Sequence, residues 1–321
     1  MTRHSRQRSV AAGIAGAAVC LVTACSTSPD RPLVEPRPMT ESPATVESAA
    51  VETPRRPLPT DPTVVAAGDI SPPRVGGQRR TSDLAVHLAP TRVLVLGDEQ
   101  YPSGGLRDFQ RYYGPTWGRL NGRTYPVPGN HEYLTPGADG YFRYFGARAR
   151  PRGHSYYSVD LGGWHLVALD SDIARDDRST QVAWLHSDLR ATTKRCVLAF
   201  WHHPRFSSGV RHGNDDSVAP FWRELYHRHA DVVLNGHEHN YERFARQTPR
   251  ARGTSAGIRE FVVGTGGNSH YPFGPAGPNS ERRIADTYGV LVLVLHPASY
   301  EWRFVAVGGQ VLDRGGPETC H

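Results

Sequence analysis

The chain has 321 residues, a formal net charge of +6 and four cysteines, and 21% of its residues are charged. A positive balance this mild helps to attract anionic substrates but is too weak to indicate a nucleic-acid partner. No stripe of basic and aromatic residues supports such a partner either, and the sequence contains no internal repeat.

The first 24 residues predict an export signal. Three arginines within residues 1–9 precede an apolar, alanine-rich run from Val10 to Ala24, which is too short to span a membrane comfortably. The tetrapeptide Val22-Thr23-Ala24-Cys25 resembles a bacterial lipobox, which predicts lipidation of Cys25 and an anchor at the cell surface. The alternative is an ordinary signal peptide, in which Cys25 has no special role and the protein is secreted. Removal of the signal takes away three arginines and no acid, so the net charge falls to about +3.

Residues 25–60 predict a disordered tether. They are dense in Pro, Ser, Thr and Glu and contain almost no large apolar side chain, so they cannot bury enough surface to fold. We therefore expect residues 61–321 to form the folded body, whose length suits a single α/β domain with a sizeable core. The membrane contact of such a protein would be made only through its N-terminal lipid.

Strands and helices are expected to alternate in the first part of this body. Apolar runs that end in Gly-Asp predict buried strands at Thr63–Ala67 and Thr91–Leu96, with a short helix from Thr81 to Leu88 between them. The elements that follow in chain order are a strand leading into Pro128, a hairpin of Tyr156–Val159 and Trp164–Leu169, a helix at Thr180–Leu189, a strand at Cys196–Trp201, a helix at Phe221–His229 and a strand at Asp231–Leu234.

Strands are expected to cluster near the end, at Glu260–Val263, Val290–Leu295 and Trp302–Val307. Early alternation followed by late strands favours an α/β (α+β) fold, in which two packed mixed β-sheets are flanked by helices and the functional loops lie at one edge. Two loops, Tyr133–Arg152 and Phe206–Ser217, are expected to determine substrate specificity.

Only Cys196 and Cys320 remain beyond the N-terminal region. Two cysteines in an exported protein often pair, and a bond between these two would pin the C-terminus to the core. Cys196 begins an apolar run and Cys320 is the penultimate residue. The alternative, two free thiols, stays open, because only geometry can decide between them.

Five short motifs carry the residues best suited to bind metal ions. Four of them begin with Gly beside a candidate ligand, and several follow an apolar β-branched run, which places them on turns at strand ends. Together they supply two carboxylates, a phenol, an amide and three imidazoles, which are enough to hold two metal ions close together. The motifs are Gly68-Asp69, Gly97-Asp98-Glu99-Gln100-Tyr101, Gly129-Asn130-His131-Glu132, His202-His203-Pro204 and Gly236-His237-Glu238-His239.

The residue types suggest how such a pair of ions would be held. Hard cations need anionic oxygen ligands, and one carboxylate can bridge two ions, which makes Asp98 the bridging candidate. Tyr101 fits a core aromatic equally well by type, but a phenolate ligand would favour a high-valent ion such as Fe(III). In the pair His202-His203, only one imidazole can face the cluster easily if the segment is extended.

Two of these motifs resemble those of a known family. Gly97-Asp98-Glu99-Gln100-Tyr101 and the stretch from Asn235 to Arg243 are similar to the purple acid phosphatases of the calcineurin-like metallophosphoesterase superfamily. The resemblance covers roughly Thr63 to Val307 and includes phrases such as Gly264-Thr265-Gly266-Gly267. It implies a four-layer metallophosphoesterase sandwich and a hydrolase that acts on phosphate esters.

The resemblance also implies a ligand set. Asp69, Asp98, Tyr101 and His239 would hold an Fe(III)-type ion. Asp98 would bridge to a divalent ion (Fe, Zn or Mn) that is also held by Asn130, His202 and His237. His202 is preferred to His203, because the family's ligand His lies two residues before Pro.

His131 and His212 are implied as the catalytic residues, which contact the phosphate and protonate the leaving alkoxide. The alternative for His212 is a solvated loop histidine. Two positions depart from the family pattern: Ser71 stands where Gly is usual, and Arg211 stands where plant relatives have His. The second departure leaves the choice of substrate open.

The function implied by the resemblance is that of a phosphomonoesterase, which cleaves a small phosphorylated substrate with a metal-bound hydroxide. One alternative is a phosphodiesterase or nucleotidase with Mn or Zn at both sites, and Tyr101 is the residue that discriminates the two. A third reading is a surface lipoprotein that binds phosphate without hydrolysing it. The sequence does not indicate an oligomeric state.

Overall fold

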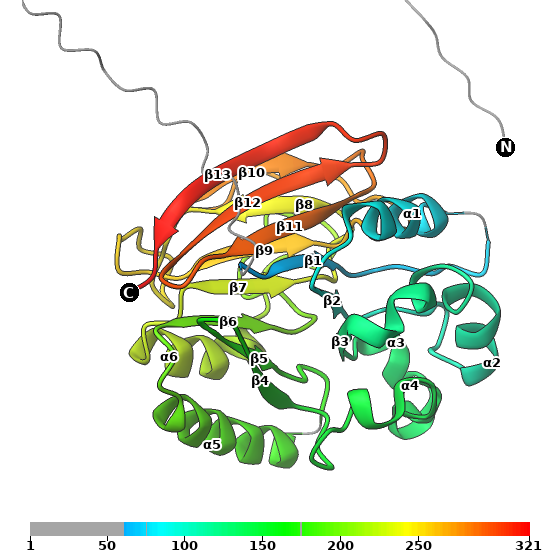
Figure 1. Cartoon of the computed structure of the whole chain (residues 1–321), viewed down its shortest axis with the longest axis horizontal. Coiled ribbons are helices and arrows are strands. Elements are labelled where there is room, and N and C mark those ends of the chain that lie inside the picture. The colour runs from blue at the N-terminus through cyan, green and yellow to red at the C-terminus, as the bar shows by residue number, and fades with distance from the viewer. Residues whose placement is uncertain (1–60, 75, 174) are drawn as a thin grey trace, which may run out of the picture. The chain divides into compact units, whose positions relative to one another are not determined.

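The fold is built on two mixed β-sheets (Figure 1). The structure, a computed structural model, describes residues 61–74, 76–173 and 175–321. The predicted signal (residues 1–24), the lipidation site Cys25 and the tether (residues 25–60) lie outside the described residues and remain predictions. Within the described part, no helix has the length and the apolar character needed to cross a membrane.

The first sheet has six strands, of which β1, β2 and β3 run parallel and the other neighbours pair antiparallel. The register pairs Ala67 with Val95 and Leu96 with Val127, so the three parallel strands end at nearly the same level. In spatial order the strands are β13 (Val311–Thr319), β12 (Ser299–Ala306), β11 (Gly289–Leu295), β1 (Thr63–Ala67), β2 (Arg92–Leu96) and β3 (Thr124–Val127).

The second sheet has seven strands. Parallel pairing joins β5, β6, β7 and β9, and antiparallel strands complete the sheet on both sides. In spatial order the strands are β10 (Ser280–Ile284), β8 (Tyr241–Phe244), β9 (Arg259–Val263), β7 (Val232–Asn235), β6 (Cys196–Phe200), β5 (Trp164–Ala168) and β4 (Tyr157–Leu161).

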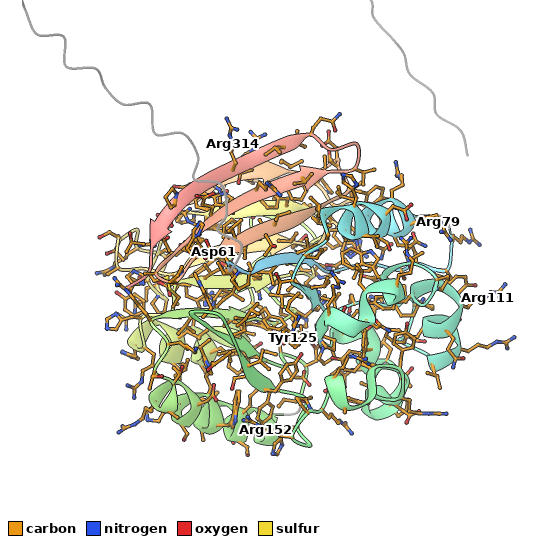
Figure 2. All side chains as sticks on the ribbon, viewed as in Figure 1. Asp61, Arg79, Arg111, Tyr125, Arg152 and Arg314 are labelled. Carbon is orange, nitrogen blue, oxygen red and sulfur yellow. A yellow bond between two sulfur atoms is a disulfide. The ribbon has the colours of Figure 1, made fainter. Side chains whose placement is uncertain are left out.

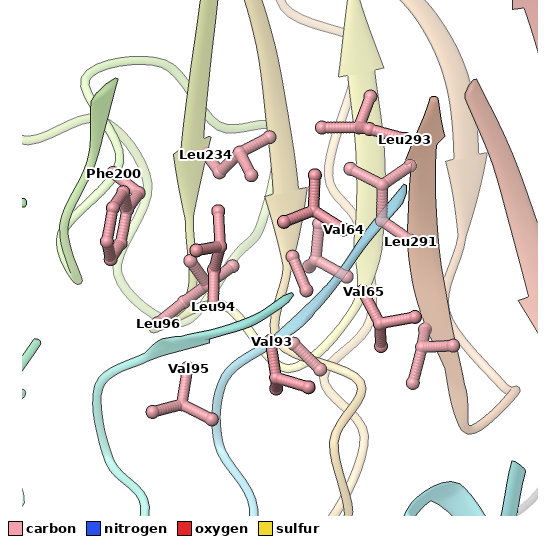
Figure 3. Close-up of a cluster of buried hydrophobic side chains, with 14 of the residues drawn as sticks. Val64, Val65, Val93, Leu94, Val95, Leu96, Phe200, Leu234, Leu291 and Leu293 are labelled. Carbon is pink, nitrogen blue, oxygen red and sulfur yellow. The ribbon is translucent and has the colours of Figure 1, made fainter. Parts of the chain in front are cut away.

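The main hydrophobic core brings side chains of both sheets together (Figure 3). Figure 3 shows Leu94 and Leu96 of β2 close to Phe200 of β6 and Leu234 of β7. Because successive side chains of a strand point to opposite faces, Ala199 belongs instead to a second buried cluster. All of β6 is buried, which explains its unbroken apolar run.

Helices flank this pair of sheets. The second buried cluster joins α5 (Arg175–Ala191) and α6 (Ala219–His227) to the second sheet, through residues such as Leu185, Trp222 and Val197. In Figure 1, α1–α4 lie beside β1–β3. Their bounds are α1 (Gln78–Leu88), α2 (Leu106–Asp108), α3 (Asn130–Tyr133) and α4 (Asp139–Phe145). Short 3-10 segments occupy Trp117–Arg123, Pro136–Ala138, Gly146–Arg148 and Asp216–Val218, and a π-helical turn occupies Phe109–Tyr113.

The predicted fold class is confirmed, although the sequence does not reveal every element. The strands β8, β10 and β13 are absent from the prediction. In β10 and β13 most residues are exposed or only partly buried, so these strands lack the apolar run that marks a buried strand. The helix expected at Thr81 begins at Gln78, and the expected loop Tyr133–Arg152 contains α4.

A disulfide joins β6 to the C-terminus. The Sγ atoms of Cys196 and Cys320 lie 2.02 Å apart, and both residues are buried. The carboxylate of Asp231, also buried, accepts hydrogen bonds from the backbone N–H groups of Val197 (2.9 Å) and His321 (2.9 Å). The bond and the carboxylate together hold the last residues against the second sheet.

Candidate metal centre

The predicted ligands lie in the loops at one edge of the two sheets. Asp69 follows β1, Asp98 follows β2 and Asn130 follows β3, whose parallel strands end side by side. His202 follows β6 and His237 follows β7, two parallel neighbours in the second sheet. Each side chain therefore leaves the carboxyl end of a buried strand, the edge where parallel strands present their functional loops.

Three of these ligands have left-handed backbone conformations. The φ angles are 60° at Asp69, 50° at Asp98 and 70° at His237. Residues with a Cβ atom are uncommon in this region, and such conformations persist where the surrounding structure over-determines them, often at functional sites. The strand ends thus turn abruptly and aim these three side chains into the space between the two sheets' loops.

One group of side chains converges on the hydroxyl of Tyr101. This oxygen lies 3.0 Å from Oδ1 of Asp69, 3.0 Å from Oδ2 of Asp98 and 3.1 Å from Nε2 of His239. A phenol has one proton, so it can donate to only one of these neighbours at a time. The remaining lone pairs face one another, an arrangement that a cation would satisfy.

A hydrogen bond to Ser269 and stacking on Tyr271 fix the orientation of His239. Its Nδ1 lies 2.6 Å from the backbone oxygen of Ser269 and must donate to that acceptor, which leaves the lone pair of a neutral ring on Nε2. Tyr271 stacks on the imidazole, with ring centroids 3.9 Å apart and an interplanar angle of 12°. The lone pair of Nε2 therefore faces Asp69, whose Oδ1 is 3.3 Å away.

A second group converges on Nε2 of His202. Nδ1 of this residue lies 2.8 Å from the backbone oxygen of Leu96 and donates to it. Nε2 then lies 3.2 Å from Oδ1 of Asn130, 3.4 Å from Oδ2 of Asp98 and 3.1 Å from Nδ1 of His237. Burial opposes a charge on His202, but Asp98 outweighs it and raises the pKa of the imidazole to about 10. Nε2 therefore lies where the surroundings favour a cation, either a proton or a metal ion.

Asp98 contributes to both groups, as expected of a bridging ligand. Its Oδ2 is the atom that faces both Tyr101 and His202. Asp98, His202 and His237 present ligand atoms that all lie within 4.8 Å of one another. The residues present therefore fit two neighbouring ions: Asp69, Asp98, Tyr101 and His239 around one, and Asp98, Asn130, His202 and His237 around the other.

His203 is oriented differently from its neighbour. Its Nδ1 lies 2.9 Å from Oγ of Ser171 and 3.4 Å from Oδ2 of Asp172. The ring packs against His237 at 4.2 Å between centroids. His202 is therefore the member of the pair that directs a nitrogen at Asp98 and Asn130. His203 packs beside the predicted ligand His237 instead.

The centre buries negative charge without a permanent countercharge. Arginines such as Arg79, Arg111, Arg152 and Arg314 project outward (Figure 2), and within the described residues neither Asp69 nor Asp98 forms an ion pair with Arg or Lys. Burial favours the neutral form of Asp98, but His202 and His131 outweigh it and lower the pKa of the carboxyl. Burial and the neighbouring His202 lower the pKa of His237, which keeps this imidazole neutral.

Glu132 organises the loops of the centre, a role that the sequence does not reveal. Its carboxylate is fully buried and accepts the backbone N–H groups of Asp98 (2.9 Å), Gln100 (3.0 Å) and Gly129 (2.8 Å). It therefore fastens the loop that carries Asp98 to the loop that carries Asn130. The only available signal was its place in the Gly-Asn-His-Glu motif.

Close approach explains the glycines beside the ligands. A Cβ atom on Gly129 would lie 2.3 Å from Oδ1 of Asp98, and one on Gly97 would lie 2.6 Å from Nδ1 of His202. Atoms cannot approach this closely, so each glycine leaves room for the ligand of another loop. The recurrent Gly-ligand pattern thus follows from the crowding of five loops around one centre.

The two predicted catalytic histidines lie beside the ligands and are partly open to solvent. Nε2 of His131 is 3.8 Å from Oδ2 of Asp98, its ring centroid is 4.3 Å from that of Tyr101, and 30% of its side chain is exposed. The ring of His212 packs against His237 at 3.9 Å between centroids, and the residue is exposed. Both imidazoles can therefore meet a molecule that approaches the centre from solvent.

Comparisons with known proteins agree with this geometry. Residues 62–241 match a family model described as calcineurin-like phosphoesterase. The chain is 30% identical to purple acid phosphatase 15 of Arabidopsis thaliana over 219 residues, which are 57% of this chain and 41% of that protein. Its fold resembles purple acid phosphatase PPD1 from yellow lupin (Lupinus luteus) seeds, with a TM-score of 0.66 and 17% identity over 79% of this chain and 53% of that chain.

The fold is shared more widely. GAP50, the anchor in the inner membrane complex of Plasmodium, has a TM-score of 0.63 and 13% identity over 82% of this chain and 90% of that chain. Likeness at this level of identity concerns the architecture alone. The chain spans about half the length of the plant proteins named above.

Proposed function

Since the chain belongs to the calcineurin-like phosphoesterase family, a family of binuclear metal-dependent phosphatases, we propose that it is a phosphomonoesterase of the purple acid phosphatase type. In this proposal one ion is Fe(III) and the other is divalent Fe, Zn or Mn. The substrate is a small phosphate monoester.

The observation that carries the proposal is the position of the Tyr101 hydroxyl. It lies within hydrogen-bonding distance of two carboxylates, those of Asp69 and Asp98, and of Nε2 of His239. A phenolate with two carboxylates forms a hard, anionic oxygen set that suits a trivalent ion better than a divalent one. The other set, with one carboxylate, one amide and two imidazoles, carries less charge and suits a divalent ion.

The residues of the chain then have distinct tasks. Two bound ions would lower the pKa of water and offset the charge of the phosphate. His131 and His212 donate hydrogen bonds to the phosphoryl oxygens, and one of them gives a proton to the departing alkoxide, a task that contributes roughly 100- to 10,000-fold in general. His202 and His239 each donate Nδ1–H to a backbone carbonyl, which directs Nε2 toward the site, and an ion bound there would take the place of any proton on Nε2.

A cavity that is lined in part by the loop Tyr133–Arg152, and by none of the predicted ligands, supports a role for this loop in specificity. The cavity has a volume of about 650 Å³, and Tyr133, Arg150 and Asp172 are among its lining residues. Asp172 lies 3.4 Å from His203, whose ring packs against His237. The organic part of a substrate can thus extend from the metal centre toward these side chains.

The disulfide supports export. Bonds between cysteines persist in oxidising compartments and are rare in the cytosol, and Cys196 is bonded to Cys320 here. We therefore propose that the protein acts outside the cytoplasm, with Cys25 as the site of a lipid anchor and that anchor as its only membrane contact.

The proposal is tested by replacing Tyr101 with Phe in the iron-loaded protein. Wild type is expected to show a purple or pink absorption band and to hydrolyse p-nitrophenyl phosphate. Tyr101→Phe is expected to lose the band, because the band requires a phenolate on Fe(III). Tyr271→Phe is the matched control, since Tyr271 stacks on His239 through its ring, and it should keep the colour.

A colourless iron-loaded wild type that is fully active with two Mn or two Zn ions would contradict the Fe(III) assignment. Faster hydrolysis of bis(p-nitrophenyl) phosphate than of the monoester would favour the phosphodiesterase or nucleotidase reading.

A further inference from the structure

Buried glutamates accept hydrogen bonds from the backbone of the loop that follows β6. Residues 205–213 of this loop carry Arg211, whose guanidinium lies over the ring of Tyr271, and His212, whose ring packs against that of His237. Glu260 of β9 accepts the backbone N–H groups of Arg205 (3.0 Å) and Phe206 (3.3 Å) at the start of the loop. Glu242 of β8 accepts the N–H of Ser208 (2.7 Å) in its middle.

Glu238 holds the end of the loop, where His212 lies. One oxygen, Oε1, accepts the N–H groups of both His212 (2.6 Å) and Gly213 (2.8 Å). Glu238 is fully buried, and within the described residues its Oε2 has no hydrogen-bond partner. Two successive backbone N–H groups that converge on one oxygen form an anion-binding nest, which here is filled by the protein's own carboxylate.

The loop also wraps closely around this carboxylate. A Cβ atom on Gly209 would lie 2.2 Å from Cδ of Glu238 and 2.3 Å from its Oε2. Only glycine can pass so close, and Gly213 adopts a φ of 71° as the chain turns around the carboxylate. The segment 209–213 therefore depends on the position of Glu238 for its own shape.

The place of Glu238 in the chain links this nest to the metal centre. It lies between His237 and His239 in a tightly turned segment, in which His237 has a φ of 70° and Glu238 donates its backbone N–H to Gly236. In this turn the imidazoles face His202 and Tyr101, while the carboxylate between them faces the loop. One short segment thereby sets the distance between two predicted ligands and the backbone of His212, whose ring packs 3.9 Å from that of His237.

We propose that Glu238 is a positioning residue, which holds His212 in place to protonate the leaving group. The proposal rests on the function proposed above, in which His212 meets the substrate. A misplacement of about 1 Å can lower a rate by roughly 100-fold. Loss of the nest should therefore act on the proton-transfer step more than on metal binding.

The test replaces Glu238 with Val or Gln in the metal-loaded full-length chain. Val removes the acceptor, whereas Gln keeps one oxygen that can accept both N–H groups. Two readouts are needed: hydrogen–deuterium exchange of the peptide that spans residues 205–217, and the ratio of kcat for an alkyl phosphate to kcat for p-nitrophenyl phosphate. The alkyl ester needs a proton for its leaving group far more than the nitrophenyl ester does.

Glu238→Val is expected to accelerate exchange at His212 and Gly213 and to lower the kcat ratio by about 10-fold, with metal content and colour retained. Glu238→Gln should stay close to wild type in both readouts. His212→Ala gives the reference value for complete loss of the acid.

Glu260→Val is the matched control. Glu260 is equally buried, and one of its oxygens likewise accepts two successive N–H groups while the other has no partner in the described part. Its loss should accelerate exchange at Arg205 and Phe206 without changing the kcat ratio. Should Glu238→Val fail to fold, Gly209→Ala pushes the loop off the carboxylate without altering residues 237–239, and it should lower the kcat ratio in the same way.

Unchanged exchange at His212, an unchanged kcat ratio, or equal losses with Gln and Val would each overturn the proposal. These outcomes differ from a failure of the proposed function, which would show as wild-type protein that hydrolyses neither ester. The exchange measurement remains informative in that case, because it needs no turnover.

Discussion

The metal centre and the outer corner formed by β8, β9, β10 and β13 both concentrate charged side chains, but they satisfy them differently. At the corner, Arg259 pairs with Glu318 (2.5 Å) and Glu281 (2.8 Å), and Arg243 pairs with Asp313 (2.7 Å) and with Glu281. Both guanidinium groups also lie over the ring of Trp302, at 4.8 and 5.2 Å from its centroid. Glu281, Asp313 and Glu318 therefore each have a permanent positive partner.

At the metal centre, the acids face imidazole, amide and phenol groups instead. Asp69 and Asp98 are buried without an Arg or Lys partner in the described part of the chain. A buried charge is costly unless it is paired or binds a metal. The acids of the corner are therefore neutralised within the protein, whereas the carboxylates of the centre need bound cations to balance their charge.

The largest expected effect follows from removing the shared carboxylate of the centre. Asp98→Ala should abolish stable binding of the metal pair and lower phosphatase activity by far more than 100-fold, since loss of outer partners alone typically costs about 10- to 100-fold. Metal analysis and p-nitrophenyl phosphate assays check this. The thermal midpoint of the metal-free protein should fall only slightly, because Asp98 accepts the N–H of His131 and the hydroxyl of Tyr101 there; a large fall would show that Asp98 serves the fold itself.

Removal of the disulfide should give the next largest effect, on stability rather than on metal content. The bonded cysteines are 124 positions apart, and native disulfides typically contribute about 2–4 kcal/mol. Urea unfolding of Cys196→Ala/Cys320→Ala is expected to show a loss in this range, with two metal ions retained in the folded protein. Loss of the metals at low urea would show that the metal centre depends on the disulfide.

Breaking the corner should have a smaller effect. Arg259→Met leaves Glu318 and Glu281 each with one fewer charged partner, and hydrogen bonds to charged groups contribute about 1.5–3 kcal/mol. We expect a loss of about 2 kcal/mol in the free energy of unfolding, measured by urea denaturation, and unchanged activity below the transition. A loss of activity without a loss of stability would mean that the ion pairs of the corner affect the geometry of the metal centre.

The smallest effect concerns a histidine that resembles a ligand but has both nitrogens satisfied. Nδ1 and Nε2 of His165 lie 2.8 Å from Asp160 and 2.8 Å from Asp188. Burial opposes the charged imidazole, but the hydrogen bonds to Asp188 and Asp160 outweigh it and raise the pKa. The stabilisation is therefore fully present below the unfolded-state pKa of about 6.5 and is lost as the pH rises through the higher folded-state pKa.

His165→Gln is accordingly expected to reduce stability by about 1 kcal/mol at pH 6 and by less at pH 9. Urea unfolding of wild type and variant at both pH values measures the difference. An equal loss at the two pH values would indicate that packing, and not the charged hydrogen bonds, accounts for the role of His165.

Most of the predicted ligands can be identified from the sequence, because they follow apolar strands and most have a glycine as a neighbour in the chain. The motifs of Asp69, Asp98 and Asn130 belong to three parallel strands that end together, so short-range patterns suffice to bring them to one edge. The two-sheet architecture is readable for the same reason, since both faces of its central strands are buried.

The buried glutamates that hold the loops around the ligands cannot be identified from the sequence in this way. Glu132, Glu238 and Glu260 are buried acids whose partners are backbone N–H groups of loops far away in the sequence. Glutamate is normally a surface residue, so its type gives no hint of burial. The edge strands β10 and β13 escape prediction because they bury few apolar side chains, and the pairing of Cys196 with Cys320 depends on the register of strands that the sequence does not reveal.

The most direct test of the central claim is the metal content and visible absorption of the purified full-length protein, measured together with hydrolysis of p-nitrophenyl phosphate. We predict two ions per chain, one of them iron, a purple or pink band, and turnover of the ester. Protein that binds no metal and hydrolyses no ester would contradict the account.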